Sequence, residues 1–195
     1  MKHRILNSLV ILSILLMQVF TIIGVTPSHA AGAFTLSTTF PNPGGAALTD
    51  MWGSAANDVF IVGHVNGNTP IVYHNDGSGW SYVLPSKPAG LDVSLNSVWG
   101  AASNDVYAVG SGFDWGTYYN TPLIYHYDGS SWTYIQPALP TDWVDGALID
   151  VWGSNASNIY VAGYVHDAGY NTRPLIYHYD GSGWTIMTPE LFGVV

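Results

Sequence analysis

Three segments of the chain bring aromatic and acidic side chains together in a way that suits ligand binding. Residues 111–121 read SGFDWGTYYNT, residues 164–173 read YVHDAGYNTR, and residues 137–147 contain two aspartates beside a tryptophan. Aromatic faces beside carboxylates and amides fit sugars, which present an apolar C–H face and many hydroxyls. The predicted ligand-binding residues are Trp115, Tyr118, Tyr119, Asp142, Trp143, Asp145, His166, Asp167, Tyr170 and Arg173.

Within this set, Trp115 and Trp143 are the expected stacking platforms, and Asp142, Asp145 and Asp167 the expected hydrogen-bond acceptors. The ligand class is a glycan or an extracellular protein surface. An alternative is that these aromatic side chains only pack the loops together.

Catalysis is the less favoured interpretation of the same residues. The chain has no Gly-x-Ser-x-Gly elbow, P-loop or His-Glu-x-x-His motif. Two carboxylates about 5–9.5 Å apart would suffice for a glycosidase, and residues 114, 142, 145 and 167 are all aspartates. A glycoside-active enzyme therefore stays an alternative to a non-catalytic binding module.

Composition limits the class of protein. Of 195 residues, 48% are apolar, 14% aromatic and 9% charged, with 22 glycines, which favours β-structure with tight turns. The chain lacks cysteine, which excludes disulfides and thiolate ligands. A net charge of −9 disfavours nucleic-acid binding, which depends on neutralising phosphates. We expect no cofactor and no metal site.

Residues 1–30 have the pattern of a secretory signal peptide. A basic start, residues 2–4, precedes an apolar run at 5–25, and the small residues Ser28 and Ala30 predict cleavage after Ala30. The run is also long enough for an uncleaved membrane anchor, which is the alternative. Cleavage would leave Lys87 and Arg173 against 13 acidic residues, in a protein that is secreted or at the cell surface and not membrane-bound.

Three motifs each occur three times in the remaining chain. The first is LTDMWG, LNSVWG or LIDVWG, the second is typified by NDVYAVG, and the third by PLIYHYDGSSW. The copies start at residues 48, 95 and 148 for the first motif, at 58, 105 and 158 for the second core, and at 70, 122 and 174 for the third. Each repeat predicts four short strands, with an Asp-Gly-Ser turn between the last two.

Four strands in about 50 residues, repeated in tandem, indicate an all-β protein made of β-propeller blades. The motifs resemble the propeller repeats of secreted bacterial proteins, and in cadence they are similar to tectonin (tachylectin-type) and Asp-box (BNR) repeats. They depart from the Asp-box because three residues, not four, separate Asp128 from Trp132, and because His126 stands where that motif has Ser or Thr. The resemblance to Asp-box proteins also implies a sialidase, but such enzymes use three arginines and the mature chain would keep only Arg173.

The expected organisation is a signal peptide at 1–30, an N-terminal strand and linker at 31–47, and blades at 48–94, 95–147 and 148–190. Residues 191–195 match the start of another repeat. Because propellers close with about four to eight blades, we expect a partial or truncated propeller. A ring assembled from two or more chains, which would self-associate through open blade faces, is the alternative.

The repeated polar and aromatic residues are expected to be structural. The tryptophans of the first motif would pack between blades, those of the third would anchor the last strand, and the aspartates would order the turns. These residues are Trp52, Trp99, Trp152, Trp80, Trp132, Trp184, Asp76, Asp128 and Asp180. The histidines His74, His126 and His178 recur at one strand position, which favours a structural hydrogen bond over a metal site.

Function would lie on the variable loops, 64–69, 85–94, 111–121, 137–147 and 164–173. Another alternative to a glycan-binding module is an interaction scaffold, in which the same propeller is one module of a larger surface protein.

Overall fold

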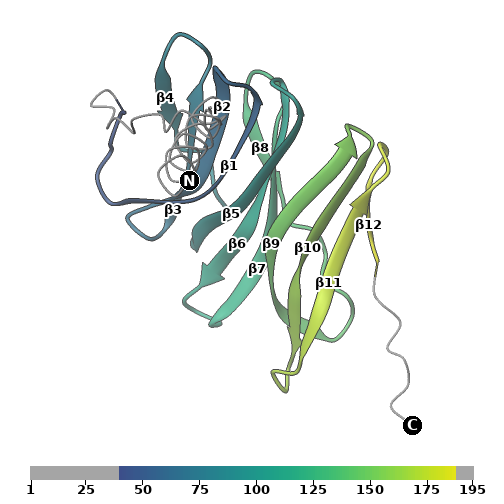
Figure 1. The fold of residues 1–195 in the computed structure, drawn as a ribbon. Helices are drawn as coiled ribbons and strands as arrows, with labels where there is room; N and C mark the ends of the chain where they lie inside the picture. Colours follow the sequence, from purple (N-terminus) through teal and green to yellow (C-terminus); the bar gives the residue numbers. More distant parts are fainter. Residues whose placement is uncertain (1–39, 188–195) are drawn as a thin grey trace, which may run out of the picture. The chain divides into compact units, whose positions relative to one another are not determined.

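The computed structural model describes residues 40–187, which form an all-β unit of three four-stranded antiparallel sheets that resemble propeller blades (Figure 1). All described residues belong to one compact unit of the chain, Thr39–Val195. The predicted signal peptide, most of the predicted N-terminal strand and the predicted fourth-repeat start at 191–195 lie outside the described residues.

Each sheet contains one copy of the repeat, and neighbours in sequence are neighbours in the sheet. The first sheet consists of β1 (Ala46–Ala55), β2 (Asp58–Val65), β3 (Thr69–Asn75) and β4 (Trp80–Val83). The second consists of β5 (Leu91–Ala102), β6 (Asp105–Asp114), β7 (Tyr119–Tyr127) and β8 (Trp132–Ile135). The third consists of β9 (Trp143–Asn155), β10 (Asn158–Asp167), β11 (Thr172–Tyr179) and β12 (Trp184–Ile186).

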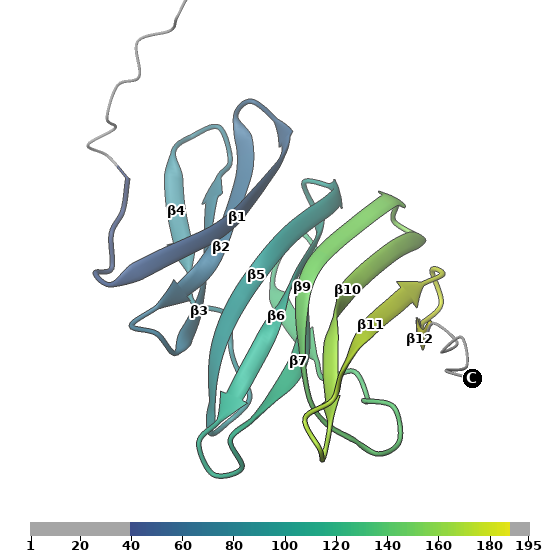
Figure 2. The same ribbon diagram turned by 60° about the horizontal axis from the view of Figure 1, so that its bottom comes forward.

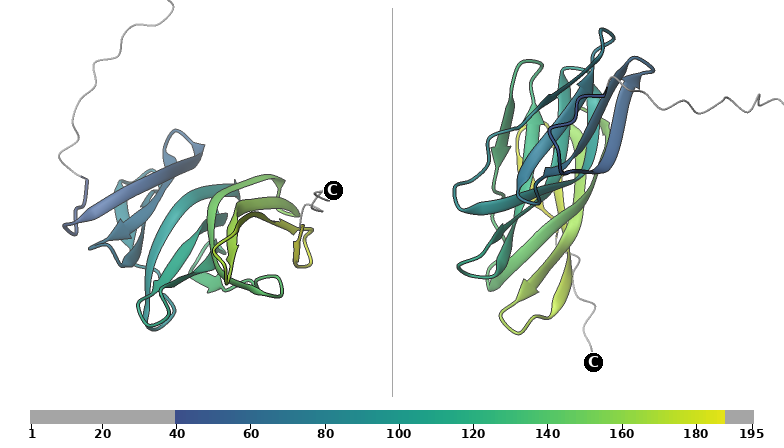
Figure 3. Two further views of the ribbon diagram at one scale, coloured as in Figure 1. Left: turned by 90° about the horizontal axis from the view of Figure 1, so that it is seen from below. Right: turned by 90° about the vertical axis from the view of Figure 1, so that its left-hand side faces the viewer.

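The sheets follow one another in chain order, and their first strands β1, β5 and β9 lie side by side (Figures 2 and 3). The second sheet is therefore covered on both faces. Along β6, Val106 and Ala108 pack toward the first sheet, while Tyr107 and Val109 pack toward the third. A strand between two sheets needs apolar residues on both faces, which is why its sequence shows no polar alternation.

Tryptophan–glycine contacts connect adjacent sheets. The ring of Trp52 lies over Gly100, and the ring of Trp99 lies over Gly153, so closely that a Cβ on either glycine would fall within 2.6 Å of a ring atom. The prediction that the first-motif tryptophans pack between blades holds for these two. In the third sheet Trp152 is 56% exposed, because no described sheet covers it.

Polar bonds between the first strands join all three sheets. Thr49 Oγ1 donates to the Leu95 carbonyl (2.7 Å), and Asn96 Nδ2 donates to the Leu148 carbonyl (2.7 Å). Ser97 is buried, with 5% of the residue exposed. Its hydroxyl lies 2.8 Å from both Asp50 Oδ2 and Asp150 Oδ1, so it can donate to either carboxylate.

The Asp-Gly-Ser turns have the predicted construction. Gly77, Gly129 and Gly181 all adopt φ near +91°, a region that suits glycine. Before each glycine an aspartate accepts from the serine after it, as in the 2.8 Å bond from the Ser130 amide to Asp128 Oδ1. These bonds, from the Ser130 hydroxyl first and then from backbone amides, lower the pKa of Asp128 to about 2.

The connections between sheets are fixed by buried tyrosines. The Tyr125 hydroxyl donates to the Ser86 carbonyl (3.2 Å), and the Tyr177 hydroxyl donates to the Ala138 carbonyl (2.7 Å). Burial raises the pKa of Tyr177 to about 12, so the phenol stays a donor across the physiological range. At the equivalent position of the first sheet, Tyr73 stacks on Phe40 with ring centroids 4.5 Å apart.

Candidate functional site

The hairpin tips between the second and third strands of each sheet belong to the variable loops in which the sequence predicted function (Figure 2). The variable segments are more ordered than expected. In the second sheet, β6 extends to Asp114 and β7 begins at Tyr119, so only residues 115–118 of the predicted 111–121 loop form the tip. In the third sheet the tip is confined to 168–171.

Three aromatic side chains project from these two tips. Trp115, Tyr118 and Tyr170 are 64%, 66% and 64% exposed. Tyr118 and Tyr170 also have positive φ, +63° and +60°. This backbone region costs a non-glycine residue about 1–2 kcal/mol and is unusual for bulky side chains. The first sheet uses Asn66 and Gly67 at the corresponding tip, two residue types that tolerate positive φ well.

The contacts of Trp115 lie within the second blade. Its indole Nε1 donates to Asp92 Oδ2 (2.6 Å), and its ring packs edge-on against Phe113 at 5.0 Å. The other carboxylate oxygen of Asp92 lies 3.8 Å from the Lys87 ammonium. The indole ring is thus held in one orientation while most of its surface stays in solvent. These contacts place the indole ring beside β5.

A second cluster does form where the second and third sheets meet. Asp145 Oδ2 lies 2.5 Å from His166 Nδ1, and Asp145 Oδ1 accepts the Asn120 backbone N–H from the neighbouring sheet. Asp145 is only 5% exposed, so its carboxylate is used by these two partners. The His166 ring lies 6.2 Å from the exposed ring of Tyr170. Asn120 was not predicted from sequence; its role is a backbone one, which no residue pattern reveals.

Other predicted site residues have local partners. The Arg173 guanidinium lies over the Trp143 ring at 5.6 Å, and Trp143 also packs against the core between the second and third sheets. Asp167 accepts from Asn171 and the Gly169 amide, and these bonds, that of the Asn171 side chain first, lower its pKa. Asp142 is exposed with φ +72°, and Tyr119 lies in β7, half-buried. Among these residues, only Asp142 keeps a carboxylate with no bond to other described residues.

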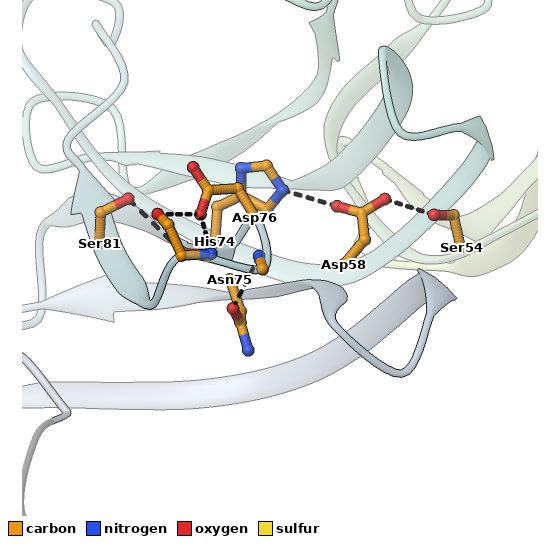
Figure 4. Close-up of polar contacts among 8 residues, drawn as sticks. Ser54, Asp58, His74, Asn75, Asp76 and Ser81 are labelled. Atoms are coloured by element: carbon orange, nitrogen blue, oxygen red, sulfur yellow. Dashed lines mark hydrogen bonds and ion pairs between the residues drawn. The ribbon is translucent and has the colours of Figure 1, made fainter.

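Each sheet also contains a histidine in its third strand that bonds to an aspartate or asparagine at the start of its second strand. His74 Nε2 lies 2.8 Å from Asp58 Oδ1 (Figure 4), His126 Nε2 lies 2.7 Å from Asp105 Oδ1, and His178 Nε2 lies 2.8 Å from Asn158 Oδ1. The expected structural bond is therefore present in all three sheets. The partner of the histidine, at positions 58, 105 and 158, could have been found from the sequence because it is always Asp or Asn.

The first of these pairs is extended by a serine. The Ser54 hydroxyl donates to the free oxygen of Asp58 and does not reach His74 (Figure 4). Burial opposes the charged form of Asp58, but the bonds from Ser54 and His74 outweigh it and lower the pKa of that carboxyl.

Two further properties of the described residues bear on function. They include no group of three or more histidine or acidic side chains placed to hold a metal ion. They also contain no helix long and apolar enough to cross a membrane.

Comparison with known proteins gives similarity at the level of the fold. No family model and no curated protein matches the chain. Among solved structures, it is similar to YCF48 bound to a D1 peptide, with 21% identity and a TM-score of 0.49 over 77% of this chain and 42% of that one. A sucrose-6-phosphate hydrolase from Lactobacillus gasseri gives 16% identity and a TM-score of 0.45 over 75% of this chain and 35% of that one.

A fucose lectin from Kordia zhangzhouensis in complex with methyl-fucoside gives 16% identity and a TM-score of 0.44 over 72% of this chain and 99% of that one. The chain thus spans less than half the length of the first two structures. None of these similarities identifies a ligand or an activity for the chain.

Proposed function

We propose that this chain is a non-catalytic binding module for neutral glycans, with its ligand on the hairpin tips of the second and third sheets. The observation that carries the proposal is the set of tip aromatics, Trp115, Tyr118 and Tyr170, each about two-thirds exposed. Two of them are kept at positive φ, where Asn or Gly would be more stable. Retaining strained, exposed rings at two separate tips is best explained by a use for those rings in binding.

The test separates binding from stability. Tyr118→Asn and Tyr170→Asn remove a ring and also remove the strain, because asparagine accepts the left-handed region. The full chain should bind a subset of a glycan array, and the double variant should lose at least about tenfold in affinity, or about 1.4 kcal/mol. Its thermal midpoint should stay the same or rise.

Trp152→Ala provides the matched control, because it removes a comparably exposed ring from a surface away from the tips. It should leave glycan binding unchanged. A blank array, or tip variants that bind as tightly as the parent, would show that the tips are not a glycan site.

An interaction scaffold is the second candidate, favoured by apolar residues on the outer faces of the first and third sheets. Leu48, Met51, Ile149 and Trp152 are each exposed by 45% or more. Apolar exposure of this kind marks surfaces that bind other proteins. If the outer faces are such surfaces, the free chain should bind a hydrophobic dye, and Met51→Asp with Trp152→Asp should abolish that binding.

We further propose that the protein is exported and that residues 1–30 are removed. The support is the basic, apolar and small-residue order of that segment. Mass spectrometry of the protein collected from the medium should find an N-terminus at Ala31. Recovery of the intact chain in the membrane fraction would support the anchor alternative instead.

A further inference from the structure

The two junctions between adjacent sheets contain equivalent open grooves. The first groove has a volume of about 400 Å³ and the second about 310 Å³, both in the range of small-ligand sites. They are lined by matching residues of successive repeats, Phe60 with Tyr107, His74 with His126, and Trp132 with Trp184. The sequence predicted the histidines and tryptophans of this set to be structural; the grooves show that they also border accessible space.

The aromatic floor has the same geometry in both grooves. His74 stacks on Phe60 at 3.9 Å and Trp132 meets Phe60 edge-on at 6.3 Å; His126 stacks on Tyr107 at 4.3 Å and Trp184 meets Tyr107 edge-on at 6.1 Å. Such an arrangement fixes ring positions before any ligand arrives, which lowers the entropic cost of binding.

The histidine that lines each groove also has one ring nitrogen that no described residue uses. Nε2 of His74 and of His126 faces an aspartate oxygen, so Nε2 carries the hydrogen and Nδ1 of the neutral ring is left as the acceptor. Neither Nδ1 bonds to any described residue. Hydroxyl side chains line the same space, Ser81 and Ser131 in the first groove and Thr133 in the second.

The groove linings contain no Lys, Arg, Asp or Glu. A charged ligand would lose its hydration there without gaining an ion pair. A neutral ligand with an apolar face and several hydroxyls matches the rings, the imidazole acceptor and the serine or threonine hydroxyls. We propose that both grooves are saccharide-binding sites, two per chain, in which a ligand hydroxyl donates to Nδ1 of His74 or His126. This inference takes its ligand class from the proposed function but places the ligand elsewhere.

The third repeat provides an internal control. His178 makes the same bond to Asn158 and stacks on Tyr160 at 4.4 Å. Among the described residues, however, no sheet supplies the other wall of a groove beside it, as Trp132 and Trp184 do beside His74 and His126. His178 is therefore expected not to bind ligand.

The experiment is calorimetric titration of the full chain with the methyl glycosides of glucose, galactose, mannose, fucose and N-acetylglucosamine. At least one probe should bind at two groove sites per chain, in addition to any site on the tips, with Kd in about the millimolar range. His74→Gln and His126→Gln keep a side-chain N–H where Nε2 was, but they remove the imidazole ring and with it the acceptor at the Nδ1 position. Each should remove one site, both together should remove both, and His178→Gln should remove none.

Two rim substitutions test the same sites without touching the histidines. Ser131 is exposed, and a Cβ at Gly183 would meet nothing within 4 Å, so Ser131→Trp and Gly183→Trp should fold and each block one groove. The inference is overturned if no probe binds, or if binding survives both the glutamine pair and the tryptophan pair. Binding lost only in the Tyr118→Asn, Tyr170→Asn protein would also overturn it while supporting the tip site. Binding lost only in the groove variants would support the grooves and count against the tips.

Discussion

The aspartates that begin the Asp-Gly-Ser turns each gather several donors on one carboxylate oxygen. Asp128 Oδ1 accepts from the Ser130 amide, the Ser130 hydroxyl and the Ser131 amide within 2.8 Å, and Asp180 has the equivalent set within 3.1 Å. These bonds favour the ionised form and hold the pKa of both groups at about 2. The unfolded value is about 3.9.

A depressed folded-state pKa makes stability depend on pH in one direction. The ionised turn aspartates stabilise the fold fully above the unfolded pKa, and that contribution is lost as pH falls from about 4 to about 2. Asp128→Asn with Asp180→Asn keeps an acceptor oxygen but removes the titration. The double variant should therefore show a weaker decline in urea-unfolding free energy across this interval. An unchanged slope would mean that other carboxyls control acid stability.

The histidine–aspartate pairs yield a second prediction at the scale of single residues, because the third repeat already carries the substitution. Asn158 bonds His178 at the same distance, 2.8 Å, as Asp58 bonds His74. Asp105→Asn should therefore lower the free energy of unfolding by less than about 1 kcal/mol. Asp105→Leu leaves the Nε2–H of His126 without its partner and should cost about 1–3 kcal/mol. Equal losses in chemical denaturation would show that the hydrogen bond is unimportant to that sheet.

Between elements, the contact of greatest consequence is the tryptophan ring on the glycine of the next sheet. Trp99 covers Gly153, whereas the equivalent Trp152 has no described partner. Trp99→Ala should open a cavity in the second junction and lower the unfolding free energy by about 2–4 kcal/mol. Trp152→Ala removes the same kind of side chain from an exposed site and should change the unfolding free energy by about 0.5 kcal/mol or less. Similar losses at both positions would mean that Trp152 is covered in solution.

The sequence was sufficient for the elements because the repeat shows their number and order. It underestimated their length. Ser94, Ser111 and Asn120 are polar and suggested loops, but backbone pairing needs no apolar side chain, and all three lie in paired strands. For the candidate site the sequence supplied residue types, and the structure adds the contacts that those residues make. Trp115 bonds Asp92, 23 residues earlier in the chain, and such a contact between distant residues is not visible in one sequence.

At the scale of the whole molecule, the outer face of the third sheet corresponds to the face that each earlier sheet presents to the next sheet. The outer face of the first sheet corresponds to the face that receives it. The third sheet of one chain could therefore pack on the first sheet of a second chain, in a head-to-tail pair. The polar residues of these two faces oppose such a pair. In the existing junctions, residues at one repeat position meet across the sheets, as Ser97 meets Asp50 and Asp150. A head-to-tail pair would place Asp150 against Asp50 of the second copy. It would also set Ile149, which cannot donate a hydrogen bond, where Thr49 and Asn96 donate to the next leucine carbonyl.

We therefore expect light scattering of the full chain to give the mass of a monomer at micromolar concentration. Like charges in a junction cost free energy, and the missing donor leaves a carbonyl unpaired as water is excluded. Ile149→Asn with Asp150→Asn copies the donor of Asn96 and removes the charge opposing Asp50, so this variant should shift toward a dimer. A discrete dimer of the parent chain, or a variant that stays monomeric while folded, would show that factors other than these two positions govern the pairing of the outer faces.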